Sequence, residues 1–252
     1  MPAKTIDEVI AELEAIIADC GNIKSTAGYF AALYHSVTVR VKKGILNNEF
    51  EDNASMERLD VIFANRYLTA YNQWKAGKAP SVSWDTAFSA THKRSTIVLM
   101  HLLAGMNAHI NLDLGIAAVE ATVGGDIHSI QKDFNTINTV LAAMVYEVIR
   151  SLNRVSPVLS LLGLHATDNN EMLIGFTIDN ARDGAWCFAE DLAKKTGTDY
   201  ADCIATRDTV INGLAKNIVH PSNRMMRITL WFVHLIEWRN ACKIINVLHK
   251  KQ

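Results

Sequence analysis

The sequence predicts an all-α protein, and three observations support this fold class. Apolar residues recur at three- and four-residue spacing through most of the chain, whereas alternating, strand-like runs are scarce. The 252 residues include only 4 prolines, and these stand at breaks of the pattern. Apolar residues make up 49% of the chain, which is enough for a large buried core and excludes disorder. We therefore expect residues 1–252 to form a single domain, a bundle of about 8–10 helices around a central apolar helix at about 94–122.

Most of the expected helices begin near a capping residue or end near a glycine. Thr5 followed by Glu8 has the spacing of a capping box, and Asp168 followed by Glu171 repeats it. Serines and threonines precede other periodic segments, at Ser55, Ser83, Thr198 and Ser222. Glycines follow plausible last turns, at Gly21, Gly44, Gly77, Gly124, Gly125, Gly163 and Gly197. In chain order, the expected helices cover 5–19, 26–44, 55–76, 84–91, 94–122, 127–153, 157–163, 168–195, 199–217 and 222–249.

The central helix is the most informative of these elements. Residues 95–112 contain no Asp, Glu, Lys or Arg, so by length alone the segment could cross a membrane. It carries two histidines and two asparagines, however, and Asp113 follows directly. Such polar groups are costly in hydrocarbon unless the protein satisfies them. We therefore expect no membrane span, and instead a helix packed on all sides within a soluble bundle.

Composition and missing motifs exclude several classes of function. The chain has 25 Lys+Arg against 26 Asp+Glu, a net charge of −1, so a general nucleic-acid binder is not expected. The four cysteines stand far apart, as reduced thiols do, and acidic residues interrupt the first twenty positions where a signal peptide needs an apolar run. A cytoplasmic location follows. The motifs HExxH, ExxH, GxSxG, GxGxxG and Walker A do not occur.

One face of the central helix collects the residues that could carry chemistry. Because each helical residue advances by about 100°, four ionisable side chains share a sector of about 120°: His101, His109, Asp113 and Glu120. Gly105 lies on the same face between the two histidines, and its missing side chain leaves a gap for an ion, a substrate or a neighbouring side chain. Asn107 and Asn111 lie on the opposite side, where they are expected to bind neighbouring helices.

His109 and Asp113 form an HxxxD pair, which has three readings. The spacing lets both side chains bind one metal ion, or lets the carboxylate orient the imidazole for acid–base catalysis. A purely structural hydrogen-bonded pair is the third reading. His101 on the same apolar helix favours a shared polar site, because three polar side chains buried without partners would be costly.

Further ligands would have to come from facing helices of the bundle. His35, Asp60 and Asp133 each lie in apolar surroundings and complete the predicted metal set with His101, His109 and Asp113. Each of the three could instead be a satisfied core group. Histidine and carboxylate ligands suit zinc, iron or manganese, and the sequence does not choose among them.

Arg182 and Trp186 are predicted to contact substrate. They stand four residues apart, so both lie on one helix face, and the arginine could bind an anionic group. The alternative, which we favour, is that Arg182 pairs with a buried carboxylate such as Asp60 or Asp133, because buried charges require partners. His234 and Glu237 form an HxxE pair of lower interest, since their aromatic neighbours fit a packed helix equally well.

The segment HLLAGMNAHINLDLGIAAVE, with LDVIFANRYLTAYNQW before it and DFNTIN and ARDGAW after it, resembles an uncharacterised bacterial family of unknown function. The resemblance spans roughly His35 to Trp186. It implies signature positions without a role for any of them, at His101, Asn107, His109, Asn111 and Asp113. A looser likeness is to the helical zinc-dependent phospholipase C type, from which the chain departs by lacking that type's terminal tryptophan ligand and its several HxxxE or HxxxD steps.

Two hypotheses of function follow from the sequence. In the first, the protein is a metal-dependent enzyme that activates water to hydrolyse a small ester or phosphoester, with an iron and oxygen chemistry as its variant and His109 and Asp113 as catalytic residues. In the second, the same residues form a structural core network in a non-catalytic helical protein that binds a ligand or oligomerises. The expected partner is a small molecule, and a homo-oligomer is possible.

Overall fold

The computed structural model describes residues 1–122, 125–161 and 178–249, and every regular element within these ranges is a helix. The prediction of an all-α fold around a central apolar helix is therefore confirmed. The α-helices are α1 (Ile6–Asn22), α2 (Gly28–Leu46), α3 (Asn53–Lys75), α4 (Val82–Ser89), α5 (Val98–Ala108), α6 (Leu114–Ala121), α7 (Gln131–Val155), α8 (Pro157–Leu161), α10 (Ile178–Leu192), α11 (Gly197–Val219), α12 (Arg224–Ile236) and α13 (Ala241–Leu248). Short 3-10 turns η1 (Ala90–His92) and η3 (Ile127–Ile130) and the π-helical η2 (His109–Asp113) complete the fold.

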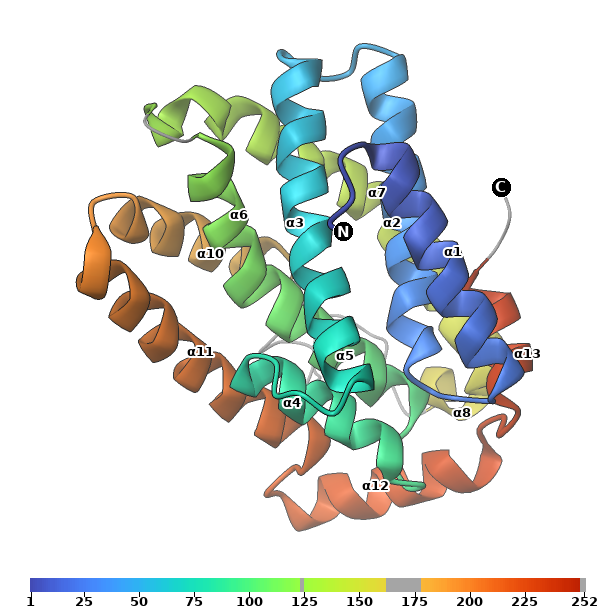
Figure 1. The fold of residues 1–252 in the computed structure, drawn as a ribbon. Coiled ribbons are helices and arrows are strands. Elements are labelled where there is room, and N and C mark those ends of the chain that lie inside the picture. Colours follow the sequence, from blue (N-terminus) through green and yellow to red (C-terminus); the bar gives the residue numbers. More distant parts are fainter. Residues whose placement is uncertain (123–124, 162–177, 250–252) are drawn as a thin grey trace.

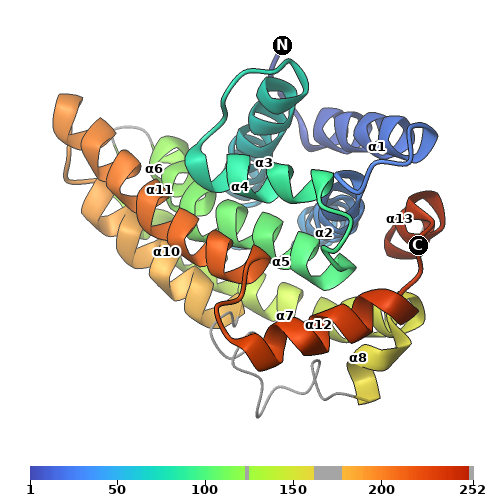
Figure 2. The same ribbon diagram turned by 90° about the horizontal axis from the view of Figure 1, so that it is seen from below.

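The helices pack around α5, η2 and α6, which form one continuous rod (Figure 1). Helix α5 contacts α2 on one side and α4 and α11 on the other, while α6 lies against α3 and α10 (Figure 2). Helices α1, α2 and α3 contact one another, and α13 packs against both α1 and α2. This arrangement places the polar part of the rod, around η2, between α3 and α11.

The rod is buried along most of its length. Val98–Ala121 is 24 residues long and apolar enough to cross a membrane, yet 83% of its most apolar window is buried inside the protein. A core helix of a soluble protein has the same length and composition. The gap that Gly105 leaves is filled, because a Cβ at this position would lie 2.5 Å from the ring of Phe30.

A π-helical segment interrupts the rod, whereas the sequence predicts a single α-helix over 94–122. Residues 109–113 form η2, and the α-helix itself begins at Val98. Tertiary contacts hold this segment: Arg207 on α11 donates from Nε to the carbonyl oxygen of Asn111 at 2.9 Å. The expectation that the two asparagines bind neighbouring helices is confirmed for Asn107, whose side chain donates to the Ile211 carbonyl on α11, whereas the Asn111 side chain donates to Asn107 within the rod. Such π segments are frequent at functional sites.

The helix expected over 222–249 is wrong as a single element, because it breaks between α12 and α13. Glu237 has extended backbone, and its carboxylate accepts hydrogen bonds from the Val98 N–H at 3.0 Å and from the Ser156 hydroxyl. Asn240 then caps α13 by accepting from the Lys243 N–H. Burial raises the pKa of Glu237 to about 7. The break therefore follows from contacts with segments more than eighty residues away in the chain. The periodicity of a helix carries no information about such contacts.

The expected helix starts differ in detail from those observed. The capping box at Thr5 is confirmed, since its hydroxyl accepts from the Glu8 N–H at 3.2 Å. Helix α3 is capped by Asp52 rather than Ser55, and α4 by Ser81 rather than Ser83. The expected start at Asp168 lies outside the described residues.

Candidate functional site

Asp113, the last residue of η2, is the centre of a buried hydrogen-bond network. Its Oδ2 accepts from the indole Nε1 of Trp84 at 2.8 Å and lies 3.1 Å from Nδ1 of His109. Its Oδ1 accepts from Nε of Arg66 at 3.1 Å. The side chain of Asp113 is only 3% exposed. Three donors thus satisfy this carboxylate, as a buried charge requires.

Helix α4 brings Trp84 to this network because α11 holds the start of α4. The carboxylate of Asp208 on α11 accepts from the backbone N–H groups of Val82 at 2.7 Å and Ser83 at 3.0 Å. An acidic side chain at a helix N-terminus satisfies free N–H groups and favours the helix dipole. Asp208 therefore fixes the position from which Trp84 reaches Asp113.

His109 lies behind Asp113 in an aromatic enclosure. The Phe63 ring stacks on the imidazole with 3.6 Å between centroids, and the Tyr34 ring meets it edge-on at 4.5 Å. Burial lowers the pKa of His109 and outweighs the opposing effect of Asp113, so the imidazole is neutral near pH 7. In the tautomer that donates from Nδ1 to Asp113, Nε2 faces the enclosure as a free acceptor.

Four buried polar atoms around this enclosure have no hydrogen-bond partner among the residues that the structure describes. They are the hydroxyls of Tyr34 and Tyr67, Nε2 of His109 and Oδ2 of Asp60. Burial raises the pKa of both tyrosines well above the usual value and raises that of Asp60 to about 7. Ordered water or a ligand is the ordinary partner of such groups.

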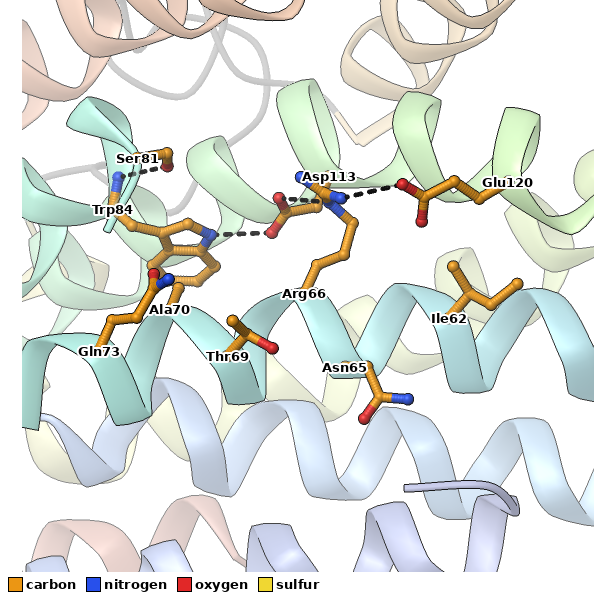
Figure 3. Close-up of a pocket in the computed structure, with 10 residues that line it drawn as sticks. All are labelled: Ile62, Asn65, Arg66, Thr69, Ala70, Gln73, Ser81, Trp84, Asp113 and Glu120. Atoms are coloured by element: carbon orange, nitrogen blue, oxygen red, sulfur yellow. Dashed lines mark hydrogen bonds and ion pairs between the residues drawn. The ribbon is translucent and has the colours of Figure 1, made fainter. Parts of the chain in front are cut away.

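A cavity of about 430 Å³ opens beside the network on the α3 side, and Asp113 and Trp84 form part of its wall. Figure 3 shows Arg66 reaching from α3 to lie between Asp113 and Glu120. The Arg66 Nη1 lies 3.4 Å from Oε1 of Glu120, which is 44% exposed. Most of the wall is polar, and the lining consists of Ile62, Asn65, Arg66, Thr69, Ala70, Gln73, Ser81, Trp84, Asp113 and Glu120.

The structure separates His101 from the His109–Asp113 pair. The His101 ring packs edge-on against the Tyr29 ring, with 5.6 Å between centroids, and forms a hydrogen bond with the backbone of Thr96. Burial lowers the pKa of His101 to about 4. The Phe30 ring occupies the space at Gly105 and also packs edge-on against the His109 ring, with 5.7 Å between centroids. Of the face predicted from sequence, Asp113 and Glu120 therefore both contact Arg66, His109 contacts Asp113, and His101 has other partners.

The remaining predicted ligands lie in three different places. Asp60 is buried in α3, and its charge together with that of Asp113 acts on Tyr34, so it belongs to the surroundings of the enclosure. Asp133 instead accepts from the backbone N–H groups of Glu51 and Asp52 at 2.7 and 2.9 Å, before the start of α3. His35 lies with Glu14 and His249, away from His109.

The two residues predicted to contact substrate lie between α7 and α10 and do not line the cavity. Arg182 donates from Nη2 to the Phe134 carbonyl at 2.7 Å, and its guanidinium lies over the Phe134 ring at 4.4 Å. The Trp186 ring packs against the same phenylalanine at 4.8 Å. Arg182 thus contacts a backbone carbonyl and an aromatic ring, and both oxygens of Asp133 accept from backbone N–H groups.

Sequence reasoning missed the two residues that complete the Asp113 network. Arg66 could have been found, because a cation within the apolar run LDVIFANRYL requires an acidic partner. Trp84 carries no such signal, since a tryptophan on a short helix is ordinarily a core residue. Glu14 and His249 were also missed, because nothing in the sequence brings positions 14, 35 and 249 together.

Comparison with known proteins identifies a family and no activity. Residues 6–221 match a family of unknown function (DUF5995), and the chain belongs to this family. The resemblance to an uncharacterised family is thereby confirmed, over a longer part of the chain than the span from His35 to Trp186. No curated protein and no solved structure matches the chain.

Proposed function

We propose that this member of a family of unknown function binds a small polar molecule in the cavity beside Asp113. The observation that carries the proposal is the 430 Å³ cavity itself, whose polar wall includes one arginine in contact with two carboxylates. Small-molecule sites have this size and a few convergent polar groups that orient the ligand. All ten lining residues fall within the part of the chain that matches the family.

The charges of the cavity point to a ligand with hydrogen-bond donors. One arginine faces two carboxylates, those of Asp113 and Glu120, so the charged groups of the wall sum to −1. Glu120 is half exposed and can exchange its contact with Arg66 for a ligand amine or hydroxyl. Arg66 uses Nε and Nη1 on the two carboxylates, which leaves Nη2 for an anionic or carbonyl group of the same molecule. A small amino- or hydroxy-acid has this combination of groups.

The position of His109 favours binding over catalysis by this residue. A general base must lie within hydrogen-bond reach of the proton that it removes. The imidazole does not line the cavity, and its Nδ1 is engaged with Asp113. Its role in the proposal is to hold the Asp113 carboxylate in place behind Arg66.

The test is a ligand screen on the full chain and on a variant with a filled cavity. Thr69 is an exposed residue of the wall and takes no part in the hydrogen bonds of Asp113, so Thr69→Trp should block the cavity and leave the network intact. The probes are a panel of amino acids, hydroxy-acids and sugars, followed by thermal shift and calorimetry. We expect at least one compound to bind the unchanged protein and to bind Thr69→Trp more than tenfold less tightly.

The matched control is Thr209→Trp on α11, an exposed threonine outside the cavity, which should bind the same compound normally. Glu120→Gln should weaken amine-bearing compounds more than neutral ones, because it removes one of the two carboxylates. Binding that survives in Thr69→Trp, or a panel without any bound compound, would refute the proposal.

Metal-dependent hydrolysis of a small ester or phosphoester stays a prediction from the sequence, as does its iron variant. At Asp113 a metal would have to displace one or more of three donors. Assay of nitrophenyl acetate and nitrophenyl phosphate with added zinc, manganese or iron would test it. Turnover that Thr69→Trp abolishes would support hydrolysis in this cavity, and absence of turnover would leave binding as the function.

A further inference from the structure

A second cluster of imidazole and carboxylate groups lies where α1, α2 and the end of α13 meet. Among the described residues, Glu14, His35 and His249 are the one group of three such side chains whose ligand atoms all lie within 4.8 Å of one another. His35 Nε2 is 3.6 Å from Glu14 Oε1, and the two imidazole rings meet at 4.4 Å and 75°. None of the three lines the cavity beside Asp113.

We propose that Glu14, His35 and His249 bind a divalent transition metal ion of the zinc type. Two histidines and one glutamate are a common ligand set for zinc, and the same set binds iron in other sites. Ligands at about 2.1 Å from a tetrahedral ion lie roughly 3.4 Å apart, so the three atoms need only a small closure. Glu14 is 54% exposed and free to rotate, while the His35 side chain is 9% exposed and held by the helix packing.

The exposure of the cluster determines what the ion could do. Three protein ligands leave at least one coordination position for water, which is the arrangement of catalytic rather than closed structural zinc sites. Because His249 follows α13 and the other two ligands stand on α1 and α2, the ion would also fasten the C-terminal helix to the N-terminal pair. Metal binding should therefore stabilise the fold by mass action.

The test uses the full chain without a histidine tag, stripped with a chelator and titrated with Zn²⁺ and with Co²⁺. We expect one zinc per chain, a higher melting temperature with zinc, and cobalt absorption bands of a four- or five-coordinate ion. Glu14→Gln and His249→Ala should each weaken zinc at least tenfold. Both positions are partly exposed, so these variants should fold, as circular dichroism would verify.

The matched control is His128→Ala, which removes an exposed histidine that also lies near a glutamate, Glu190, at 3.8 Å. This variant should bind zinc like the unchanged protein. The proposal would be overturned by a zinc content well below one per chain. It would also be overturned if Glu14→Gln and His249→Ala bound zinc as tightly as the unchanged protein does. A failed ligand screen at the cavity would leave this result unaffected, because the two sites share no residue.

A separate observation concerns the outer face of α12, beyond the residues that match the family. Its inner side is anchored by the buried Leu230 and Val233. Its outer side and the following turn expose large apolar side chains, each 40% to 76% exposed: Met225, Ile228, Trp231, Phe232, Leu235, Ile236 and Trp238. Monomeric soluble proteins seldom expose so continuous an apolar face, which therefore indicates a contact surface.

We infer that this face of α12 binds the surface of an anionic lipid bilayer. Between positions 222 and 249 the only acidic residue is Glu237, which is buried, whereas four exposed cations flank the apolar face: Arg224, Arg227, Arg239 and Lys243. Aromatic and aliphatic side chains between cations are typical of helices that lie in the membrane interface. A two-fold contact with a second copy would instead bring the same arginines together.

Co-sedimentation with vesicles tests this surface. We expect the protein to bind vesicles of phosphatidylcholine with 30% phosphatidylglycerol, to bind pure phosphatidylcholine at least tenfold less, and to dissociate in high salt. Trp231→Ser with Phe232→Ser should abolish binding. Val210→Ser with Leu214→Ser, an exposed apolar pair on α11, should leave it unchanged. Binding independent of lipid charge, or a dimer that the first pair of substitutions dissolves without any vesicle binding, would overturn the inference.

Discussion

Two clusters, the first of His109 and Asp113 and the second of Glu14, His35 and His249, contain imidazole and carboxylate groups in opposite surroundings. At Asp113, the carboxylate is 3% exposed and three donors occupy its oxygens, while the neighbouring His109 is enclosed by aromatic rings. At Glu14, the carboxylate is 54% exposed and lies beside two imidazoles. Side-chain identity is thus insufficient to assign a metal site. The number of donors already on the carboxylate, and its access to solvent, decide whether it can still bind an ion.

The largest expected difference between the clusters is in stability. Asp113→Ala removes the acceptor of Trp84, Arg66 and His109 in the core, so the free energy of unfolding should fall by about 3–5 kcal/mol. Glu14→Ala removes a half-exposed carboxylate and should change it by less than about 0.5 kcal/mol. Urea denaturation measures both. Similar losses in the two variants would show that the clusters are not distinguished by burial.

The pH dependence of stability sharpens the comparison for the enclosure. Asp60 has a pKa of about 7 in the folded protein, above its usual 3.8, so the folded state binds more protons than the unfolded state between these values. Protonated Asp60 therefore contributes its full stability below pH 4. This contribution, at most about 4 kcal/mol, is lost as the pH rises through 7.

Asp60→Asn should therefore flatten the curve of unfolding free energy against pH between 4 and 8 and raise stability at pH 8. Urea titrations at five pH values would measure the change. The control Glu12→Gln, an exposed carboxylate on α1, should leave the curve unchanged. An unaltered slope in Asp60→Asn would mean that Asp60 is charged in the folded protein.

Two glycine substitutions compare the packing beside the first cluster, at Gly105, with that at Gly213 on α11. A Cβ at Gly105 would lie 2.5 Å from the Phe30 ring, which is itself packed on His109, so Gly105→Ala should destabilise by about 1–3 kcal/mol despite the helix propensity of alanine. Gly213→Ala on α11 meets nothing within 4 Å and should stabilise by about 0.5–1 kcal/mol. Thermal unfolding would give the two signs. Stabilisation by both substitutions would show that the space at Gly105 is open.

The smallest expected effect is on metal binding at the first cluster. His109→Asn should leave the number of zinc ions per chain and the zinc affinity unchanged, because His109 belongs to no group of three ligands among the described residues. Calorimetric titration of this variant beside His249→Ala makes the contrast direct. Loss of zinc in His109→Asn with retention in His249→Ala would reverse the assignment of the two clusters.

Much of the candidate site was accessible from sequence where the interactions are local. His109 and Asp113 stand four residues apart on one helix, and they do meet at 3.1 Å. Arg66 and Trp84 join them from positions 47 and 29 residues away, and no helical pattern encodes such pairs. His101 shared the predicted face, yet Phe30 and Tyr29 from another helix separate it from His109. The π segment has no signal in the local sequence, and at the break after Ile236 the one local signal is the capping residue Asn240.

The sequence by itself determined the helical class, the central apolar rod and the pairing of His109 with Asp113, because periodicity, capping and four-residue spacing act within a few turns of one helix. Only the tertiary structure decided which charges meet. In the folded protein Asp113 accepts hydrogen bonds from Arg66 and Trp84. Asp133 accepts from the backbone before α3, and His35 lies beside Glu14 and His249. Burial then set their properties, because a donor or acceptor that is removed from solvent depends on a partner from elsewhere in the chain.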